Sequence, residues 1–483
     1  MEALMCELGT LATYQPSAEV PWNRDAALHV YRRLGYGLDP GDLDAVLSAD
    51  AATHIRARLD AAAAVAPMPE PDFANKPFSA YGDFDEAVQE VIDWRSMWVG
   101  DFRQNPWRAK LTLFWSNHFV TQVDVYQCPS WMWQYHDLLQ RYAFGNFKTF
   151  VREVGRTPAM LVYLNGVQST RLEPNENYAR ELFELFTLGE GNGYTQQDIV
   201  EAARALTGWN GYTEACAPIG YVPALHDPGA KTIFGQTGNY DYDGLIDLLF
   251  AERAVEVSQH VCRRLYRHFV SEDLDEAIVA QLAETLRGAD WELMPVYKQL
   301  FASEHFLSPA LYGNRVKGPL ELLLGAERTF GTAAFDTDEL TLAFWFVAGE
   351  LGQLLLDPPD VAGWPGGRAW INANLLALRN TFSTDFAGLI YGTDKFELIR
   401  WARRLDIGDE TDVDEVVRAV VDYVLPKGLP TAAEYDAAVA TFKGEVPSYY
   451  FDTGIWDLGY QYAPEQMVVL VIYLLRRPEF QLC

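Results

Sequence analysis

Apolar side chains recur every three to four residues along most of this chain, in segments separated by glycine and proline. This spacing places them on one face of a helix. The pattern therefore predicts a mainly α, multi-helical globular protein with long Gly/Pro-rich loops and at most small β-hairpin inserts. The predicted helices include 24–34, 51–64, 83–102, 106–120, 130–143, 196–206, 254–269, 275–286, 291–302 and 319–330. Thr195-Gln196-Gln197-Asp198 resembles a capping box and predicts a helix start there.

Composition shifts along the chain suggest three regions within one compact unit. Residues 1–75 form an N-terminal helical region and linker, 76–390 a helical core with the candidate site, and 391–483 a C-terminal acidic helical region. Two Gly/Pro-rich segments interrupt the helical pattern, an irregular insert over 208–243 and a loop over 355–370. Loops of this length in compact proteins are usually functional or disordered.

The segment 175–189 (NENYARELFELFTLG) predicts a short helix with one dense polar face and one dense apolar face. The polar side chains fall within an arc of about 140° when successive residues are placed 100° apart. They are Glu176, Asn177, Arg180, Glu181, Glu184 and Thr187. Such a face is either an exposed ladder of ion pairs or the wall of a site. Asn175 and Asn177 flank Glu176, and Asn177 is a poor helix former, which favours a site.

A formal net charge of −29 makes nucleic acid and anionic membranes poor partners. No apolar run approaches the length that spans a bilayer, so no membrane span is expected. Five widely spaced cysteines without a CxxC predict reduced thiols instead of a disulfide framework. The N-terminus lacks the features of a signal peptide, so we expect a cytoplasmic protein, or an exported one if a leader was removed.

Two other segments carry candidate chemistry. His118 lies on the apolar, aromatic face of the predicted helix 106–120, where it is a base with a tuned pKa or, more commonly, a core histidine. His226 and Asp227 precede a Pro-Gly turn that brings them near Lys231. Signatures of zinc proteases, P-loops, nucleophile elbows and EF-hands are absent.

Taken together, these segments resemble the bacterial domain of unknown function 1800 family. The matching runs are 114–119 (FWSNHF), 175–189, 193–198 (GYTQQD), 203–209 (ARALTGW), 226–231 (HDPGAK), 264–270 (RLYRHFV), 316–321 (VKGPLE), 358–365 (PPDVAGWP) and 478–481 (PEFQ). The resemblance implies a mostly helical fold and does not specify a reaction. It also implies envelope or polysaccharide work and a phosphatase- or sulfatase-like partner protein encoded nearby.

The leading hypothesis is an enzyme that uses carboxylate and histidine acid–base chemistry, in hydrolysis or elimination on a glycan-like substrate or another small molecule. The predicted catalytic residues are Glu176, His118, Asp227, Glu181, Arg180 and Lys231. The predicted substrate-binding residues are Asn175, Asn177, Trp115, Trp209, His226 and Trp364. This hypothesis requires no cofactor.

Two alternatives stay open at this point. The first is a metal-dependent enzyme in which a divalent Fe, Mn or Zn ion is held by glutamate and histidine. The second is a non-enzymatic, envelope-associated structural or assembly protein, in which the same polar residues tie helices together through buried ion pairs.

Overall fold

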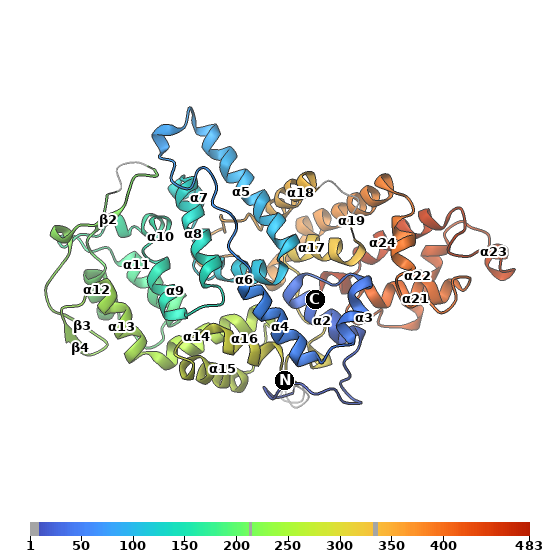
Figure 1. Cartoon of the computed structure of the whole chain (residues 1–483), viewed down its shortest axis with the longest axis horizontal. Helices are drawn as coiled ribbons and strands as arrows, with labels where there is room; N and C mark the ends of the chain where they lie inside the picture. The colour runs from blue at the N-terminus through green and yellow to red at the C-terminus, as the bar shows by residue number, and fades with distance from the viewer. Residues whose placement is uncertain (1–8, 212–214, 332–336) are drawn as a thin grey trace. The chain divides into compact units, whose positions relative to one another are not determined.

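The structure is a computed structural model that describes residues 9–211, 215–331 and 337–483. These residues form helices joined by loops, together with two small antiparallel sheets of two strands each, so the predicted mainly α fold is confirmed (Figure 1). Within the described ranges, no helix combines the length and apolarity needed to cross a bilayer.

The chain divides into two compact units, each assembled from segments far apart in sequence. Unit 1 consists of Met1–Ile55, Phe301–Gln353 and Gly366–Cys483, and unit 2 of Arg56–Leu300 and Leu354–Pro365. The region boundaries expected from composition, after residues 75 and 390, stay predictions.

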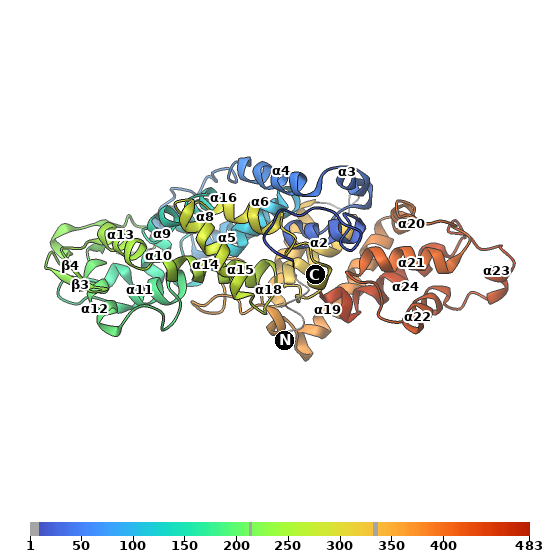
Figure 2. The ribbon, with the colours of Figure 1, turned by 90° about the horizontal axis from the view of Figure 1, so that it is seen from below.

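Unit 2 contains the segments that carry most of the candidate chemistry. Its elements are α5 (Phe84–Gln104), α6 (Pro106–Ser116), α7 (Val123–Tyr126), α8 (Pro129–Tyr142), α9 (Phe147–Val154), α10 (Pro158–Tyr163), α11 (Glu176–Glu181), the π-helix η4 (Leu182–Thr187), α12 (Gln196–Ala205), β1 (Trp209–Asn210), β2 (Gly220–Tyr221), β3 (Lys231–Ile233), β4 (Gln236–Gly238), α13 (Tyr242–Glu252), α14 (Ala254–Phe269) and α15 (Glu276–Gly288). Helix α12 packs against α11 and β3, and α14 packs along α15, as Figures 1 and 2 both show.

Unit 1 contains the C-terminal helices. Its elements are α2 (Arg24–Gly35), α3 (Leu43–Leu47), α17 (Pro319–Phe330), α18 (Thr337–Glu350), α19 (Ala373–Thr393), α20 (Glu397–Ala402), α21 (Val413–Val424), α22 (Ala432–Lys443), α23 (Ser448–Asp452) and α24 (Ala463–Leu475). Helices α4 (Ala51–Ala64) and α16 (Leu293–Phe301) contain the boundaries between the units. Helix α24 packs against α19 and α22.

Side chains before the helices set where many of them begin. Asn23 accepts a hydrogen bond from the backbone N–H of Ala26 at 3.1 Å, and Asp83 accepts one from Glu86 at 3.0 Å. The predicted capping box at the start of α12 is confirmed, since Asp198 N–H donates to Thr195 Oγ1 at 3.2 Å and Thr195 N–H donates to Asp198 Oδ2 at 2.8 Å. Such caps satisfy backbone donors that the helix itself leaves free.

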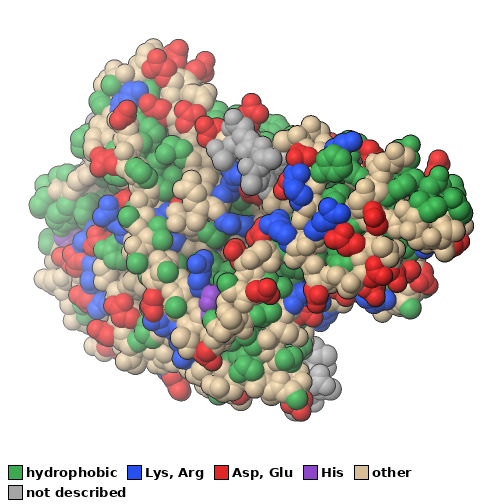
Figure 3. Space-filling view, turned by 45° about the vertical axis from the view of Figure 1, so that its right-hand side comes forward, with side chains coloured by type: hydrophobic (Ala, Val, Ile, Leu, Met, Phe, Trp, Pro, Cys, Tyr) green, Lys and Arg blue, Asp and Glu red, His purple; other side chains and the backbone are tan. Residues whose placement is uncertain are grey.

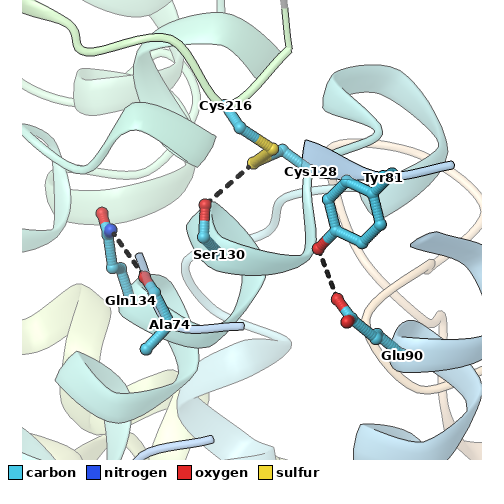
Figure 4. Close-up of a disulfide and its surroundings, with 7 residues drawn as sticks. All are labelled: Ala74, Tyr81, Glu90, Cys128, Ser130, Gln134 and Cys216. Atoms are coloured by element: carbon cyan, nitrogen blue, oxygen red, sulfur yellow. Dashed lines mark hydrogen bonds between the residues drawn. A yellow bond between two sulfur atoms is a disulfide. The ribbon is translucent and has the colours of Figure 1, made fainter. Parts of the chain in front are cut away.

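The expectation of five reduced thiols is wrong, because Cys128 and Cys216 form a disulfide (Figure 4). Cys128 directly precedes α8, and Cys216 lies between β1 and β2 in the predicted irregular insert. Their Cα atoms are 5.3 Å apart although 88 residues separate them in sequence. Cys262 and Cys483 are buried free thiols, and Cys6 lies outside the described residues.

Candidate functional site

The segment 175–189 begins as predicted, with Asn175 as the residue that caps α11. The side-chain oxygen of Asn175 accepts a hydrogen bond from Asn177 N–H at 2.9 Å, and Asn175 N–H donates to Ser169 Oγ at 3.1 Å. The side-chain oxygen of Asn175 therefore already accepts a hydrogen bond from the helix backbone. The side-chain amide of Asn177 makes no hydrogen bond to any described residue.

Glu176, Arg180 and Glu184 form a ladder of ion pairs on the outer face of this segment. Arg180 Nη2 lies 3.1 Å from Glu176 Oε2, and Arg180 Nη1 lies 3.3 Å from Glu184 Oε1. Gln196 at the start of α12 donates to Glu176 Oε2 at 2.8 Å. The Glu176 side chain is 41% exposed, so each pair contributes only about 0.3–0.5 kcal/mol. Glu176 is therefore occupied by surface interactions.

Glu181 has a different environment from the ladder. It is half-buried and has no hydrogen-bond or ion-pair partner among the described residues. Burial raises the pKa of its carboxyl group, the charge of Glu184 adds to this effect, and Arg180 opposes it. A carboxyl group with a raised pKa and no partner is available to exchange a proton.

Tyr163 lies within electrostatic reach of both Glu181 and Asp360. Burial, together with the negative charges of Asp360 and Glu181, raises the pKa of Tyr163 to about 12. The Tyr163 hydroxyl also has no partner in the part of the chain that is described. We call Tyr163, Glu181 and Asp360 the Glu181 group.

The loop that supplies Asp360 is held in place by Arg95 on α5. The Arg95 guanidinium pairs with Asp357 and donates from Nε to the Leu355 carbonyl at 2.8 Å. Burial raises the pKa of Asp357 to about 6, and the charge of Arg95 opposes that rise. Sequence reasoning missed Tyr163 and Arg95, and the only signal toward Asp360 was the run Pro358-Pro359-Asp360.

The predicted single α-helix over 175–189 is wrong beyond residue 181, where the chain becomes a π-helix. Leu188 N–H donates to the Phe183 carbonyl, five residues earlier, at 2.8 Å. The 100° projection of the polar face therefore fails there. π-Helices are rare and frequently lie at functional sites.

Two histidines form hydrogen bonds with backbone carbonyl groups at the end of the π-helix, which have no acceptor role within the helix. His118 Nε2 lies 3.0 Å from the Phe186 carbonyl, and His260 Nε2 lies 2.9 Å from the Leu185 carbonyl. Burial, with the charge of Arg264, lowers the pKa of His118 well below its usual range. Burial likewise lowers the pKa of His260 to about 4. Gly189 has φ +91°, and a Cβ there would lie 2.9 Å from His260 Nδ1. Both rings are therefore neutral donors that close the π-helix.

Trp364 is fixed by Asn117 and lies in the interior of unit 2. Its backbone N–H donates to Asn117 Oδ1 at 2.6 Å, and Asn117 Nδ2 donates to the Trp364 carbonyl at 3.3 Å. Arg264 donates to the Asn117 carbonyl at 3.0 Å. A Cβ on Gly363 would collide with the Asn117 side chain. The indole of Trp364 is buried, so it packs against protein in this conformation.

Asp227 lies in the turn before β3 and contacts Lys231, the first residue of that strand, whereas His226 Nδ1 lies 3.3 Å from Thr207 Oγ1. Lys231 is buried and its ammonium group donates to the carbonyls of Asp227 at 2.6 Å and Gly229 at 3.0 Å. The Asp227 carboxylate accepts from Arg204 Nε at 2.7 Å, and this hydrogen bond lowers the pKa of Asp227. These contacts hold the turn against the end of α12.

The two remaining predicted tryptophans differ in exposure. Trp115 is fully buried, and its indole N–H is within hydrogen-bond distance of the Ala143 carbonyl at 3.1 Å and of Tyr297 Oη at 3.0 Å. Trp209 is half-buried in β1, with its ring 5.6 Å from that of Tyr221. Trp209 is thus the more accessible of the two.

The predicted residues consequently occupy separate places around α11 and α12. Glu176 meets Gln196 at the start of α12, whereas Asp227 meets Arg204, eight residues or about 12 Å further along that helix. His118 contacts Phe186, ten residues after Glu176. No three His, Cys, Asp or Glu side chains within residues 9–211, 215–331 and 337–483 are grouped as metal ligands.

The chain is similar to a known protein family. No curated protein and no solved structure matches the chain significantly. The family described as Protein of unknown function (DUF1800) matches residues 29–482, which is nearly the whole chain. The chain therefore belongs to the DUF1800 family.

Proposed function

We propose that this protein is an enzyme in which Glu181 transfers a proton to or from a substrate bound beside Tyr163. The observation that carries the proposal is the state of the Glu181 carboxyl group, which is half-buried, raised in pKa and without a partner in the described chain. Glu176, the first choice from sequence, is instead paired with Arg180 and Gln196. A carboxyl group with a raised pKa keeps a larger protonated fraction near neutral pH, as a general acid requires.

The proposed substrate is neutral and rich in hydroxyl groups, as glycans are. A net charge of −29 disfavours polyanionic substrates. The Tyr163 hydroxyl and the Asn177 amide both retain their hydrogen-bonding capacity, and each can donate to and accept from a hydroxyl group. The reaction in this proposal is hydrolysis or elimination at a glycosidic linkage, with Glu181 as the acid or base.

Replacing Glu181 tests this assignment directly. Glu181→Gln is expected to reduce turnover of a neutral polysaccharide by about 10²–10⁴-fold, the usual contribution of a general acid or base. Reducing ends and unsaturated products, measured separately, distinguish hydrolysis from elimination. Tyr163→Phe is expected to lower turnover in the same assay. Glu176→Gln is the matched control, and its turnover should stay within a few-fold of the parent protein.

The melting temperature of Glu181→Gln supplies a second measurement that needs no substrate. Burial raises the pKa of Glu181 in the folded protein, so its ionised form destabilises the fold above the pKa of the unfolded chain. The variant should therefore melt higher than the parent at pH 7, and this advantage should vanish as the pH falls below about 4. Full turnover in Glu181→Gln, or a lower melting temperature at pH 7, would contradict the proposal.

A second candidate function is a non-enzymatic structural or assembly role. The observation that favours it is the occupation of His118, Asp227 and Lys231 by hydrogen bonds that hold loops and helix ends. On this hypothesis the parent protein turns over no substrate and Glu181→Gln leaves assembly unchanged, while replacing Asp227 loosens the turn before β3. The enzymatic hypothesis therefore depends on the Glu181 carboxylate, whereas the structural hypothesis depends on the Asp227 carboxylate.

A further inference from the structure

The C-terminal part of unit 1 contains a pocket of about 540 Å³ between the end of α22 and the start of α24. Its walls include three tyrosines, Tyr450 on α23 and Tyr460 and Tyr462 in the loop that leads into α24. The ring centroids of Tyr450 and Tyr460 are 5.6 Å apart, and those of Tyr460 and Tyr462 are 5.7 Å apart. Pockets of this volume hold small organic ligands.

A buried glutamine fixes the position of the pocket wall. Gln466 on α24 accepts from Trp456 Nε1 at 2.9 Å and donates to the Lys443 carbonyl at 3.3 Å. Since Lys443 is the last residue of α22, these two hydrogen bonds connect α24 with the end of α22 and with the loop after α23. The pocket is consequently formed before any ligand binds.

The polar groups at the pocket include both acceptors and donors of hydrogen bonds. The Glu465 carboxylate accepts one hydrogen bond, from Tyr391 at 2.6 Å, and an ionised carboxylate has room for more. The Tyr462 side chain is 53% exposed, and its hydroxyl group has no partner among the described residues. The Lys443 ammonium lies 5.3 Å from the centre of the Phe451 ring, where it can also donate. A ligand therefore meets aromatic faces bordered by an acceptor-only carboxylate and several donors.

This combination favours a ligand that has both an apolar face and hydrogen-bond donors. A carboxylate that only accepts requires O–H or N–H donors on the ligand, which a proline-rich peptide largely lacks. Aromatic rings require an apolar face. A neutral saccharide offers C–H faces and hydroxyl groups together, and the net charge of −29 disfavours anionic ligands. Figure 3 shows hydrophobic side chains, a class that includes tyrosine, interspersed with acidic ones on the exposed surface.

We propose that the pocket lined by Tyr450, Tyr460 and Tyr462 binds a neutral oligosaccharide by stacking and hydrogen bonding. The pocket lies in unit 1, whereas the Glu181 group lies in unit 2. Saccharide binding at the tyrosines does not require catalysis at Glu181. The failure of either proposal would leave the other intact.

Saturation-transfer NMR on the full chain tests the proposal, with cellotetraose and chitotetraose as neutral probes and decaproline as the peptide probe. Saturation transfer to at least one tetrasaccharide is expected for the parent protein. Tyr462→Ala and Tyr460→Ala should each weaken its affinity about tenfold, which corresponds to the loss of one aromatic contact of about 1.4 kcal/mol. Tyr449→Ala is the matched control, because Tyr449 is 55% exposed and neighbours Tyr450 without lining the pocket.

The outcomes separate cleanly. An affinity that falls about tenfold in Tyr462→Ala and is unchanged in Tyr449→Ala supports the proposal, provided both variants melt at the parent temperature. Three results would overturn it, namely no transfer to either tetrasaccharide, equal weakening by Tyr449→Ala, or transfer to decaproline alone. Glu181→Gln should bind the tetrasaccharide as the parent does, which distinguishes this pocket from the proposed catalytic site.

Discussion

The ring of His118, a predicted catalytic residue, forms a hydrogen bond with a backbone carbonyl group. Its Nε2 is 3.0 Å from the Phe186 carbonyl, and its other ring nitrogen has no hydrogen-bond partner in the described chain. Burial keeps the ring neutral, as the lowered pKa indicates. His118 is therefore a donor to the end of a π-helix, and stability measurements can separate this role from catalysis.

We expect His118→Phe to lower the free energy of unfolding by about 1–3 kcal/mol, because the Phe186 carbonyl would lose its buried donor. Urea unfolding followed by circular dichroism gives this value. His226→Phe is a suitable control, since His226 is only half-buried in the turn before β3. Unchanged stability together with lost turnover would instead assign His118 to catalysis.

The sequence located several residues correctly without revealing their partners. The apolar periodicity of 106–120 predicted His118 on a buried face, and its ring is buried, although the helix ends at Ser116 and His118 lies in the turn that follows. Its acceptor was unpredictable because the Phe186 carbonyl becomes available only where the α-helix turns into a π-helix. Tyr163 was missed because it lies at the end of a short helix with no motif around it. Its proximity to Glu181 depends on tertiary packing alone.

At the level of elements, α12 illustrates what local sequence can predict. The pattern Thr-Gln-Gln-Asp identified both the start of the helix and the hydrogen bonds that cap it. The structure adds a contact that the pattern did not contain. Asp198 also accepts from Phe234 N–H at 2.7 Å, in the turn between β3 and β4. One carboxylate thus joins a helix start to a hairpin.

Thr195→Ala is expected to cost about 1 kcal/mol of unfolding free energy, as the loss of a helix cap usually does. Asp198→Ala should cost more, because the buried N–H of Phe234 would also lose its acceptor. Chemical denaturation compares the two variants, with Gln197→Ala as a control at an exposed position. Equal costs for Thr195→Ala and Asp198→Ala would show that the hairpin contact adds nothing.

Within the two units, several buried histidines are held neutral by the fold. Burial lowers the pKa of His260 to about 4 and that of His136 to about 3, and it lowers the pKa values of His29 and His118 well below their usual range. In the unfolded chain, histidine pKa values lie near 6.5. Between pH 6.5 and the lower pKa values of the folded state, the unfolded chain therefore binds more protons than the folded protein does. These residues stabilise the fold above pH 6.5 and lose that contribution as the pH falls.

We accordingly expect the melting temperature to fall progressively between pH 6.5 and pH 4. Differential scanning calorimetry across this range provides the measurement. His260 alone, with a folded pKa about 2.5 units below the unfolded value, accounts for roughly 3 kcal/mol once the pH reaches 4. A melting temperature that stays constant from pH 7 to pH 4.5 would contradict this expectation.

For the whole chain, sequence patterns were sufficient for the mainly α class and for the family, because both depend on features repeated along the entire length. They failed for the disulfide between Cys128 and Cys216, because a separation of 88 residues carries no local signal of contact. The candidate site was predicted in part. Its carboxylate lay in the predicted segment, whereas its neighbours came from α10 and from the loop at 354–365.

Whether the disulfide between Cys128 and Cys216 has formed depends on the redox conditions under which the protein was produced and purified. It closes a covalent loop that contains α8 to α12, and with them Tyr163 and Glu181. A loop of this length restricts the unfolded chain enough to stabilise the fold by about 4–5 kcal/mol in the chain-entropy description. Such bonds form in oxidising compartments and are rare in a reducing cytosol.

Material made with and without the bond should therefore differ in the fraction of molecules whose α11 segment is ordered. Adding reductant should lower the melting temperature of oxidised protein toward that of a Cys128→Ser/Cys216→Ser variant, and it should leave the variant unchanged. An identical melting temperature for all samples would show that the loop is not restrictive. Otherwise, specific activities measured on preparations from different hosts are comparable only after their free thiols have been counted.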